Sequence, residues 1–481
     1  NGSLSVKTLN LRPNNNPCNY PTQPTLMPTL NSNWFACFFR PPGVKKPYKQ
    51  VLNLSSGDPQ ALSLKPLTFV RQVLAGCLYP TLLHGDTLPA DVRQRVQKLL
   101  GECHSISDFI SRRDGVASDP DNIYITNGST ATLLKLFVPN GSSLQTGVLT
   151  PEPSYNGFKF ALAAQGALVV PYYLREEQGW AVQLDELHRA VLTAKGYCNL
   201  MALYVINPGN PTGHVQTKDS IKDVIRFAAE ERLIIMADEV YQSCMIGEGM
   251  EFCSYKRALM EMGAPYSNMV ELASINSISK GLMGECGLRG GYVELVNFDP
   301  SMKQNIFKLF SAMPCASLMG QIALHVMVDP PRPGQPSKTF LFKMTELCFQ
   351  EIQSNKRAII NNVRRTLGVL NSLPAITWQP VMGGMFAFPR VSFSQAAINY
   401  SQERGQEPDV MYCLRLLEDE GLCFLPGYEL GMTEGLENTH LQGCVVVLTT
   451  NLAEEYVTHE FSFDELILLR CNTWQKNINY Q

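Results

Sequence analysis

A single lysine, Lys280, lies in the stretch SINSISKGLMGECGLRGGY (residues 274–292), with two serines just before it and an arginine nine positions after it. The hydroxyls of Ser277 and Ser279 and the guanidinium of Arg289 suit the oxygens of a phosphate group. An amine beside a bound phosphate indicates a phosphorylated cofactor such as pyridoxal phosphate, which a lysine can hold as a Schiff base. The alternative is a solvated surface lysine.

Two further motifs could bind the ring of such a cofactor. In NPGNPTG (207–213) the amide of Asn210 could donate to a cofactor oxygen, although the motif could also be a simple turn. In ADEVYQ (237–242) the carboxylate of Asp238 could pair with a pyridinium nitrogen and keep it protonated. The alternative for Asp238 is a helix N-cap. The hydroxyl of Tyr241, three residues later, could reach the ring oxygen.

Two earlier motifs complete the set. TPEPSYNGF (150–158) offers Tyr155 as a flat face that could stack on a heteroaromatic ring, or as a half-buried core tyrosine. TNGST (126–130) ends an apolar run before a helical pattern. The backbone N–H groups there, with Ser129 and Thr130, would form an anion site at a helix N-terminus.

The elements that must position these residues follow an alternating pattern of short apolar runs and helical spacings. Strands are predicted at 122–126, 146–153, 167–174, 200–208 and 232–240, and helices at 184–194 and 218–231. Such alternation predicts an α/β fold with a mostly parallel, doubly wound sheet covered on both faces. Ligands of these sheets bind beyond the carboxyl ends of the strands, where the motifs fall.

The chain is predicted to divide into two lobes, since 481 residues exceed one small core. DPPRPGQP (329–336) breaks the pattern, and a long helix is expected over 339–373, followed by strand and turn signals. The expected domains are an N-terminal arm at 1–50, part of a small domain at 51–100, a large cofactor-binding domain at 101–330 and a C-terminal small α+β domain at 331–481.

Composition limits the partners. The net charge is −3, which argues against nucleic acid as an obligatory partner. The sequence contains no run of about 18 apolar residues, so no membrane span is expected. The 14 cysteines form no CxxC pair, so we expect no metal site and a reduced interior. The acid-poor N-terminal stretch lacks the amphipathic periodicity of a mitochondrial presequence. A cytoplasmic protein is therefore expected, with a mitochondrial form as the alternative.

The ordered set of phosphate turn, stacking aromatic, Asn, Asp with Tyr, Lys and Arg resembles the fold-type-I pyridoxal-phosphate aminotransferases. Within that family, MGECG and RGGY after the lysine look like the alanine aminotransferase subgroup. The stretches that carry the resemblance are GDPQA, TFVRQVLAGCLYPTLL, SRRDGVASDPDNIYIT, VINPGNPTGHVQ, ADEVYQ, VELASINSISKGLMGECGLRGGYVE and GGMFAFPR.

The resemblance implies a large domain with a mostly parallel doubly wound sheet, a smaller α+β domain and a homodimer. It also implies transfer of an amino group between L-alanine and 2-oxoglutarate, in a ping-pong reaction through pyridoxamine phosphate. Lys280 would form the Schiff base and move the proton, and Gly57 and Asn210 would lie beside the substrate. The residues that would hold the cofactor are Ser129, Thr130, Tyr155, Asn210, Asp238, Tyr241, Ser277, Ser279, Lys280 and Arg289.

The sequence departs from the family in three places. A GSYS-type segment is absent between LLGECH and SISDF, and the phosphate turn is shorter than usual. Where the family has an FRMT-type strand arginine that binds the substrate carboxylate, Val447, or Gln442 in a shifted register, stands instead. Either the chain truly lacks these pieces or they are missing from this version of the sequence. A true loss favours another amino-acid specificity, or a cofactor-binding protein that no longer transaminates.

Overall fold

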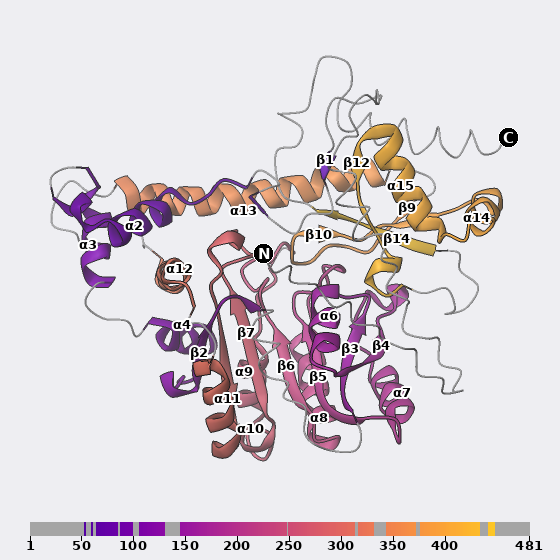
Figure 1. Cartoon of the computed structure of the whole chain (residues 1–481), viewed down its shortest axis with the longest axis horizontal. Helices are drawn as coiled ribbons and strands as arrows, with labels where there is room; N and C mark the ends of the chain where they lie inside the picture. The colour runs from indigo at the N-terminus through magenta and orange to yellow at the C-terminus, as the bar shows by residue number, and fades with distance from the viewer. Residues whose placement is uncertain are drawn as a thin grey trace, which may run out of the picture.

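The structure is a computed structural model that describes residues 52–53, 59–60, 64–84, 87–99, 105–129, 145–247, 249–312, 316–330, 343–371, 376–432 and 441–447. Its central element is a seven-stranded sheet with helices on both faces, and a second, smaller set of strands lies above it in the view of Figure 1. The expected N-terminal arm at 1–50 falls outside these residues.

The large sheet is mostly parallel, as predicted. Only β8 runs antiparallel to its neighbours within this sheet, and every other pairing is parallel. In the order of the sheet the strands are β2 (Ile123–Thr126), β8 (Gly291–Val296), β7 (Leu272–Ser277), β6 (Ile234–Asp238), β5 (Asn199–Ile206), β3 (Thr146–Glu152) and β4 (Leu168–Tyr173).

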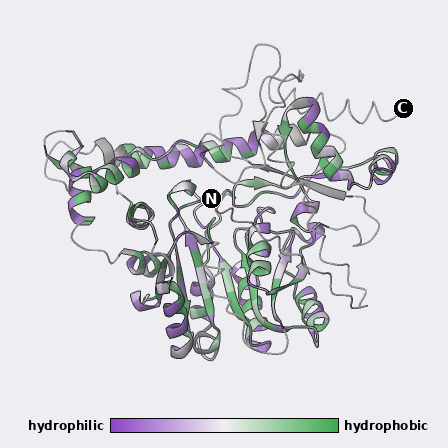
Figure 2. Ribbon diagram, viewed as in Figure 1, coloured by the Kyte–Doolittle hydropathy of each residue, from purple (hydrophilic) through white to green (hydrophobic). Residues whose placement is uncertain are grey.

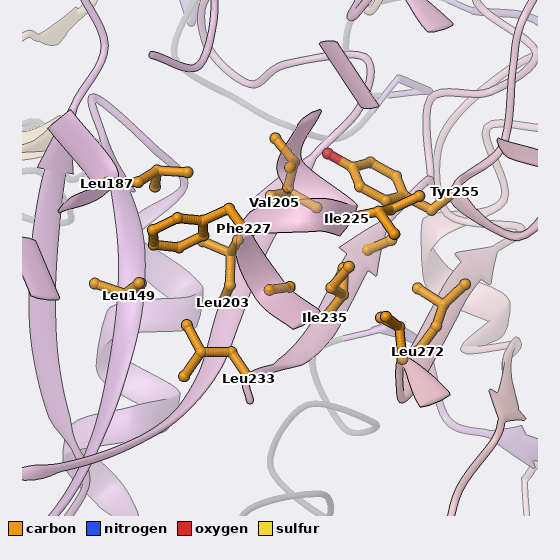
Figure 3. Packing of buried hydrophobic residues seen from close by; sticks show 14 of the residues in the cluster. Leu149, Leu187, Leu203, Val205, Ile225, Phe227, Leu233, Ile235, Tyr255 and Leu272 are labelled. Carbon is orange, nitrogen blue, oxygen red and sulfur yellow. The ribbon is translucent and has the colours of Figure 1, made fainter. Parts of the chain in front are cut away.

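Side chains of a strand point alternately to opposite sides of a sheet, so this sheet has two apolar faces. Helices cover both of them. On one face Leu203, Val205 and Ile235 pack against α7 (Leu184–Ala194), α8 (Lys218–Glu230) and α9 (Tyr255–Met262), as Figure 3 shows. The other face packs against α6 (Asn156–Ala164) and α11 (Pro300–Ala312). Figure 2 shows the resulting concentration of hydrophobic residues in the strands.

Local sequence explains where the helices begin. The side chain of Thr217 accepts a hydrogen bond from Ser220 N at the start of α8, which satisfies one N–H of the first turn. Ile221, Val224 and Ile225 then recur at three- and four-residue spacing, so they line one buried face. The helices predicted at 184–194 and 218–231 are confirmed by α7 and α8.

A long helix, α13 (Lys343–Leu370), joins two outer parts of the molecule, running above the large sheet in Figure 1. At one end it meets a helical cluster, and Val363 near its other end packs against the small sheet. The helical cluster consists of α2 (Thr68–Leu78), α3 (Ala90–Leu99), α4 (Ser105–Asp114) and α12 (Leu318–Val328).

The smaller set of strands comes from the C-terminal third of the chain and carries two helices of its own. Four of its strands lie in the order β10 (Phe386–Ala387), β14 (Leu441–Val447), β11 (Arg390–Ser392) and β9 (Ile376–Thr377), and β13 (Leu425–Pro426) also pairs with β14. β1 (Leu52–Asn53) pairs with β12 (Leu422–Cys423). The remaining helices are α10 (Tyr266–Met269), α14 (Gln395–Gln402) and α15 (Pro408–Glu420). Among the described residues, no helix is both long and apolar enough to cross a membrane.

Candidate active site

The predicted ring-binding residues and Lys280 gather at the carboxyl edge of the large sheet. Asn210 lies in the loop after β5, Asp238 ends β6 and Lys280 follows β7. Because these three strands are parallel neighbours, their carboxyl ends open onto one edge. The structure therefore brings together side chains that are up to 70 residues apart in the sequence (280 − 210).

Asp238 is a buried carboxylate with two hydrogen-bond donors. Tyr204 Oη donates to its Oδ2 at 3.0 Å, and Val240 N donates to its Oδ1 at 3.3 Å. Burial raises the pKa of Asp238 to about 6, while the two donors and the positive charge of Lys280 act in the opposite direction. Residues 239–243 form no helix, so the N-cap alternative for Asp238 does not hold.

Asn210 and Tyr241 form a polar pair beside Asp238. Asn210 Nδ2 donates to Tyr241 Oη at 3.2 Å. Tyr241 is buried, and its ring lies edge-on to that of Phe386 in the small sheet, with 5.9 Å between the centroids. Burial raises the pKa of the Tyr241 hydroxyl, which therefore stays a neutral O–H donor. The pair can present one amide N–H and one hydroxyl to an oxygen of a ligand.

The loop NPGNPTG is more than a turn, because the smaller lobe holds it. Met382 N and Gly383 N both donate to Gly213 O, at 3.0 Å and 2.9 Å. Within the large lobe, Gln216 N donates to Asn207 Oδ1 at 3.0 Å. The candidate site therefore lies where the two lobes meet, a common position for ligand sites.

Lys280 lies in the turn that follows β7, and its side chain is half-buried rather than fully solvated. Its charge acts on Asp238, which places the amine and the carboxylate in one electrostatic environment. Gly284 N donates to Lys280 O at 3.3 Å, which helps to fix the turn. These facts argue against the surface-lysine alternative.

The predicted phosphate-binding residues form a second group around Arg289. Arg289 Nη2 donates to Asn127 O at 2.9 Å, and Nη1 approaches Ser279 Oγ at 3.5 Å. Ser279 N donates to Ser277 Oγ at 3.3 Å. A Cβ on Gly128, which has φ +103°, would overlap Nη2 of Arg289. Only a glycine at position 128, just before Ser129 in the sequence, therefore lets the guanidinium lie this close to the end of β2.

Tyr155 is not a core residue, because 43% of its surface is exposed. It directly precedes α6, and its ring covers the backbone of Gly157, where a Cβ would overlap the ring atoms. Its hydroxyl interacts electrostatically with Tyr204 and Tyr241. The exposed ring thus lies at the site, where it can offer a face to a bound ligand.

Some predicted features lie outside the described residues. These are Gly57, Thr130, the junction at 100–104 where the GSYS-type segment would fall, and the side chains of β14. The backbone register pairs Gln442 with Val391 and Val447 with Phe386, so both candidate positions belong to β14. In the part of the chain that the structure describes, no group of three or more His, Cys, Asp or Glu side chains could hold a metal ion.

The donor set fits pyridoxal phosphate. The cofactor needs a carboxylate for its ring nitrogen, donors for its ring oxygen, a cation and hydroxyls for its phosphate, and an amine for its aldehyde. Asp238, the Asn210–Tyr241 pair, the group around Arg289, and Lys280 supply these in turn. The roles of the individual residues remain predictions.

Sequence reasoning missed one residue that touches this site, Tyr204, the partner of Asp238. A buried network also lies behind Asp238: Ser274 Oγ donates to Glu239 Oε2 at 2.6 Å, and Arg113 lies 3.9 Å from the same oxygen. The only sequence signal for Tyr204 was its hydroxyl in the otherwise apolar strand LMALYVI.

Comparison with known proteins gives a consistent result. The profile described as "Aminotransferase class I and II" matches residues 49–455. Alanine aminotransferase 2 of Xenopus laevis is 44% identical over 82% of this chain and 76% of its own length, and alanine aminotransferase 1 of Homo sapiens is 43% identical over 82% of each. The solved alanine aminotransferase of Pyrococcus furiosus has the same fold, with a TM-score of 0.65 over 90% of this chain and 93% of its own, at 18% identity.

Proposed function

The chain belongs to the aminotransferase class I and II family, and we propose that it transfers the amino group of L-alanine to 2-oxoglutarate, giving pyruvate and L-glutamate, with pyridoxal phosphate as cofactor. The observation that carries the substrate pair is the 43–44% identity to proteins named alanine aminotransferase, over about four fifths of the chain. The buried Asp238, the Asn210–Tyr241 pair and Lys280 at one sheet edge support the cofactor.

Each group would have a defined role. When bound, pyridoxal phosphate supplies an electron-withdrawing ring that takes up negative charge from the α-carbon of the amino acid. Asp238 would hold the proton on the ring nitrogen by charge pairing, and Asn210 and Tyr241 would hold the ring oxygen. The Lys280 amine would hold the cofactor covalently and then, once released, remove and return the α-proton. Arg289 with Ser277 and Ser279 would fix the phosphate end.

The burial of Asp238 supports its proposed pairing with the ring nitrogen. Asp238 has 6% of its surface exposed, so little water competes with a ring nitrogen for its charge. The small lobe covers the loop that carries Asn210 through the bonds from Met382 and Gly383. Water exclusion at the ring thus depends on contact between the two lobes.

The test is an absorption spectrum of the protein with its cofactor, followed by the addition of substrate. Purified protein with pyridoxal phosphate should show the visible absorption band of the lysine-bound cofactor, and the Lys280→Ala variant should lack it. L-alanine alone should abolish the band, and 2-oxoglutarate should restore it. A band that L-alanine leaves unchanged would refute the substrate, and a wild type without any band would refute the whole proposal.

A second candidate is an aminotransferase with another amino-acid preference. Position 442 or 447 in β14 is where the resemblance places a carboxylate-binding arginine, and Gln442 and Val447 carry no positive charge. Losing a bidentate charged pair costs about 1.5–3 kcal/mol for each hydrogen bond to a charged group. Band loss measured with a panel of aromatic and larger neutral amino acids would identify the preferred donor. A protein that responds to none would be a cofactor-binding protein without transamination.

We also propose a homodimer in the cytoplasm. Leu318 and Met319 are exposed apolar residues at the start of α12, and Phe307 is exposed on α11. Ser317, just before them, donates to Leu288 O next to Arg289, so this apolar surface adjoins the phosphate group. The eight cysteines whose side chains the structure describes are free thiols, as expected in a reducing compartment. Sedimentation of the wild type and of Leu318→Asp, with cell fractionation, tests both points.

A further inference from the structure

Tyr204 makes the shortest described hydrogen bond to the Asp238 carboxylate. It lies in the middle of β5 with no exposed surface, and its Oη donates to Asp238 Oδ2 at 3.0 Å. The second donor, Val240 N, reaches the other oxygen at 3.3 Å. Because the two donors hold different oxygens, together they define the plane of the carboxylate.

The strand register explains why this tyrosine reaches a residue in the next strand. Tyr204 is paired with Met236, and Ile206 is paired with Asp238. Residues two apart point to the same face, so Tyr204 and Asp238 lie on one side of the sheet. A tyrosine is long enough to reach the diagonal neighbour on the adjacent strand, which a shorter side chain is not.

The Tyr204 ring is held by stacking, and a separate hydrogen bond holds only its backbone. It stacks on Phe158 of α6, with 3.7 Å between the centroids and 28° between the planes. Its backbone carbonyl accepts a hydrogen bond from Tyr172 Oη at 2.9 Å. A stacked, fully buried ring has few alternative rotamers, so its hydroxyl is held in place for Asp238.

Resting on the proposed function, we propose that Tyr204 is a positioning residue, whose hydroxyl fixes the direction of the Asp238 carboxylate toward the ring nitrogen of pyridoxal phosphate. The hydroxyl also favours the charged form of Asp238, because it donates to an oxygen that carries the charge. Tyr204 itself stays neutral, since burial raises its pKa well above the ordinary value.

The groups that face Asp238 come from three neighbouring elements. Tyr204 reaches it from β5, Tyr241 faces it from the turn after β6, and Lys280 faces it from the turn after β7. Burial already raises the pKa of Asp238 to about 6, and loss of the Tyr204 donor removes one of the opposing effects. The carboxylate of a Tyr204→Phe variant should therefore take up a proton at a higher pH than that of the wild type.

The experiment compares two substitutions that each remove one buried hydroxyl. Tyr204→Phe keeps the ring stacked on Phe158, and Tyr172→Phe is the matched control, because its hydroxyl bonds only to the Tyr204 carbonyl among the described contacts. The apoproteins are titrated with pyridoxal phosphate from pH 5 to pH 9. We expect Tyr204→Phe to weaken binding about tenfold to hundredfold at neutral pH, and Tyr172→Phe to change it less than about threefold.

The pH dependence adds a readout that a purely structural role would not change. The pH below which Tyr204→Phe loses the cofactor should lie above that of the wild type, whereas that of Tyr172→Phe should not move. Equal binding by Tyr204→Phe and Tyr172→Phe at every pH would overturn the proposal. If the wild type binds no cofactor and Lys280→Ala behaves like it, the proposed function itself fails, which is a different outcome.

A double-mutant cycle keeps the test valid if Tyr204→Phe is less stable. In an Asp238→Asn background, Tyr204→Phe should weaken cofactor binding no further, since there is no carboxylate left to position. The same loss of affinity in both backgrounds would show that Tyr204 acts on the fold rather than through Asp238, and would refute the proposal.

Discussion

The Gly128→Ala substitution should weaken binding of the cofactor phosphate, because the added methyl group would displace the Arg289 guanidinium. Gly128 has φ +103°, and its added Cβ would overlap Nη2 of Arg289 and lie 3.1 Å from Cζ. The guanidinium would have to leave the position in which it bonds to Asn127 O and approaches Ser279. The substitution therefore combines a backbone cost with the loss of the cation from the phosphate group.

The two costs have different magnitudes and different readouts. The unfavourable backbone conformation costs about 1–3 kcal/mol of folding free energy. Loss of one charge-assisted contact to the phosphate costs about 1.5–3 kcal/mol of binding free energy, which is roughly a 10- to 150-fold rise in the dissociation constant. The side chain of Arg289 is exposed, so the lower end of that range is the better expectation.

Gly166→Ala is the matched control, because Gly166 has φ +70° and no atom lies within 4 Å of its Cβ position. Both variants should lose similar free energy of unfolding in urea, but only Gly128→Ala should lose affinity in a titration of apoprotein with pyridoxal phosphate. In an Arg289→Ala background, Gly128→Ala should weaken binding no further. Full cofactor affinity in Gly128→Ala would refute the placement of Arg289 at the phosphate.

Three further results are expected. Asp238→Asn should stabilise the apoprotein by up to about 3 kcal/mol at pH 8, since burial raises the pKa of Asp238 from 3.8 to about 6; urea unfolding should show this gap shrink as the pH falls from 6 to 4. Arg113→Met should cost about 3–5 kcal/mol, because buried Glu239 and Asp114 lose their cation, as urea unfolding at neutral pH would show. Leu203→Ala, in the core of Figure 3, should cost about 2–5 kcal/mol in the same assay without changing cofactor affinity.

The large sheet could be predicted from sequence because its signals are local. A buried strand reads as a short apolar run, and α7 and α8 show apolar residues at helical spacing. The positions of Asn210 and Asp238 follow from the same reading, since Asn210 comes two residues after the predicted strand 200–208 and Asp238 lies near the end of the predicted strand 232–240, whereas no strand was predicted directly before Lys280. Parallel neighbours then bring them to one edge without further information.

The small lobe was harder to predict, because its strands are short and their pairings are distant in sequence. β1 pairs with β12 across some 370 residues (422 − 52), and β10 has two residues. β7 and β8 lie outside the strands predicted from the sequence, so the antiparallel direction of β8 was not expected either. No periodicity specifies such partners, so only the packed structure reveals them.

Tyr204, inside the site, was missed for the same reason, because its contact with Asp238 cannot be read from the local sequence. Its partner is 34 residues away, and the contact depends on a diagonal across two strands in one register. A shift of one residue would turn the hydroxyl to the opposite face, against α7 and α8. The apolar composition of β5 fixes that register by burying Leu203 and Val205 on the other side. The hydrophobic pattern therefore positions a polar contact that the pattern itself does not reveal.

The residues proposed to face the cofactor lie mainly on the large sheet, whereas the two candidate carboxylate-binding positions lie in the smaller lobe. Asp238, Tyr204 and Lys280 depend on the large sheet, whereas positions 442 and 447 belong to β14 of the smaller lobe. A change in β14 would leave Asp238, Tyr204 and Lys280 in place, although Val447 pairs with Phe386, whose ring lies edge-on to that of Tyr241. A protein with a normal visible band and no response to L-alanine would therefore show that the cofactor is bound and that L-alanine is not the substrate. The response to L-alanine consequently reports on substrate choice, and the band alone reports on Lys280.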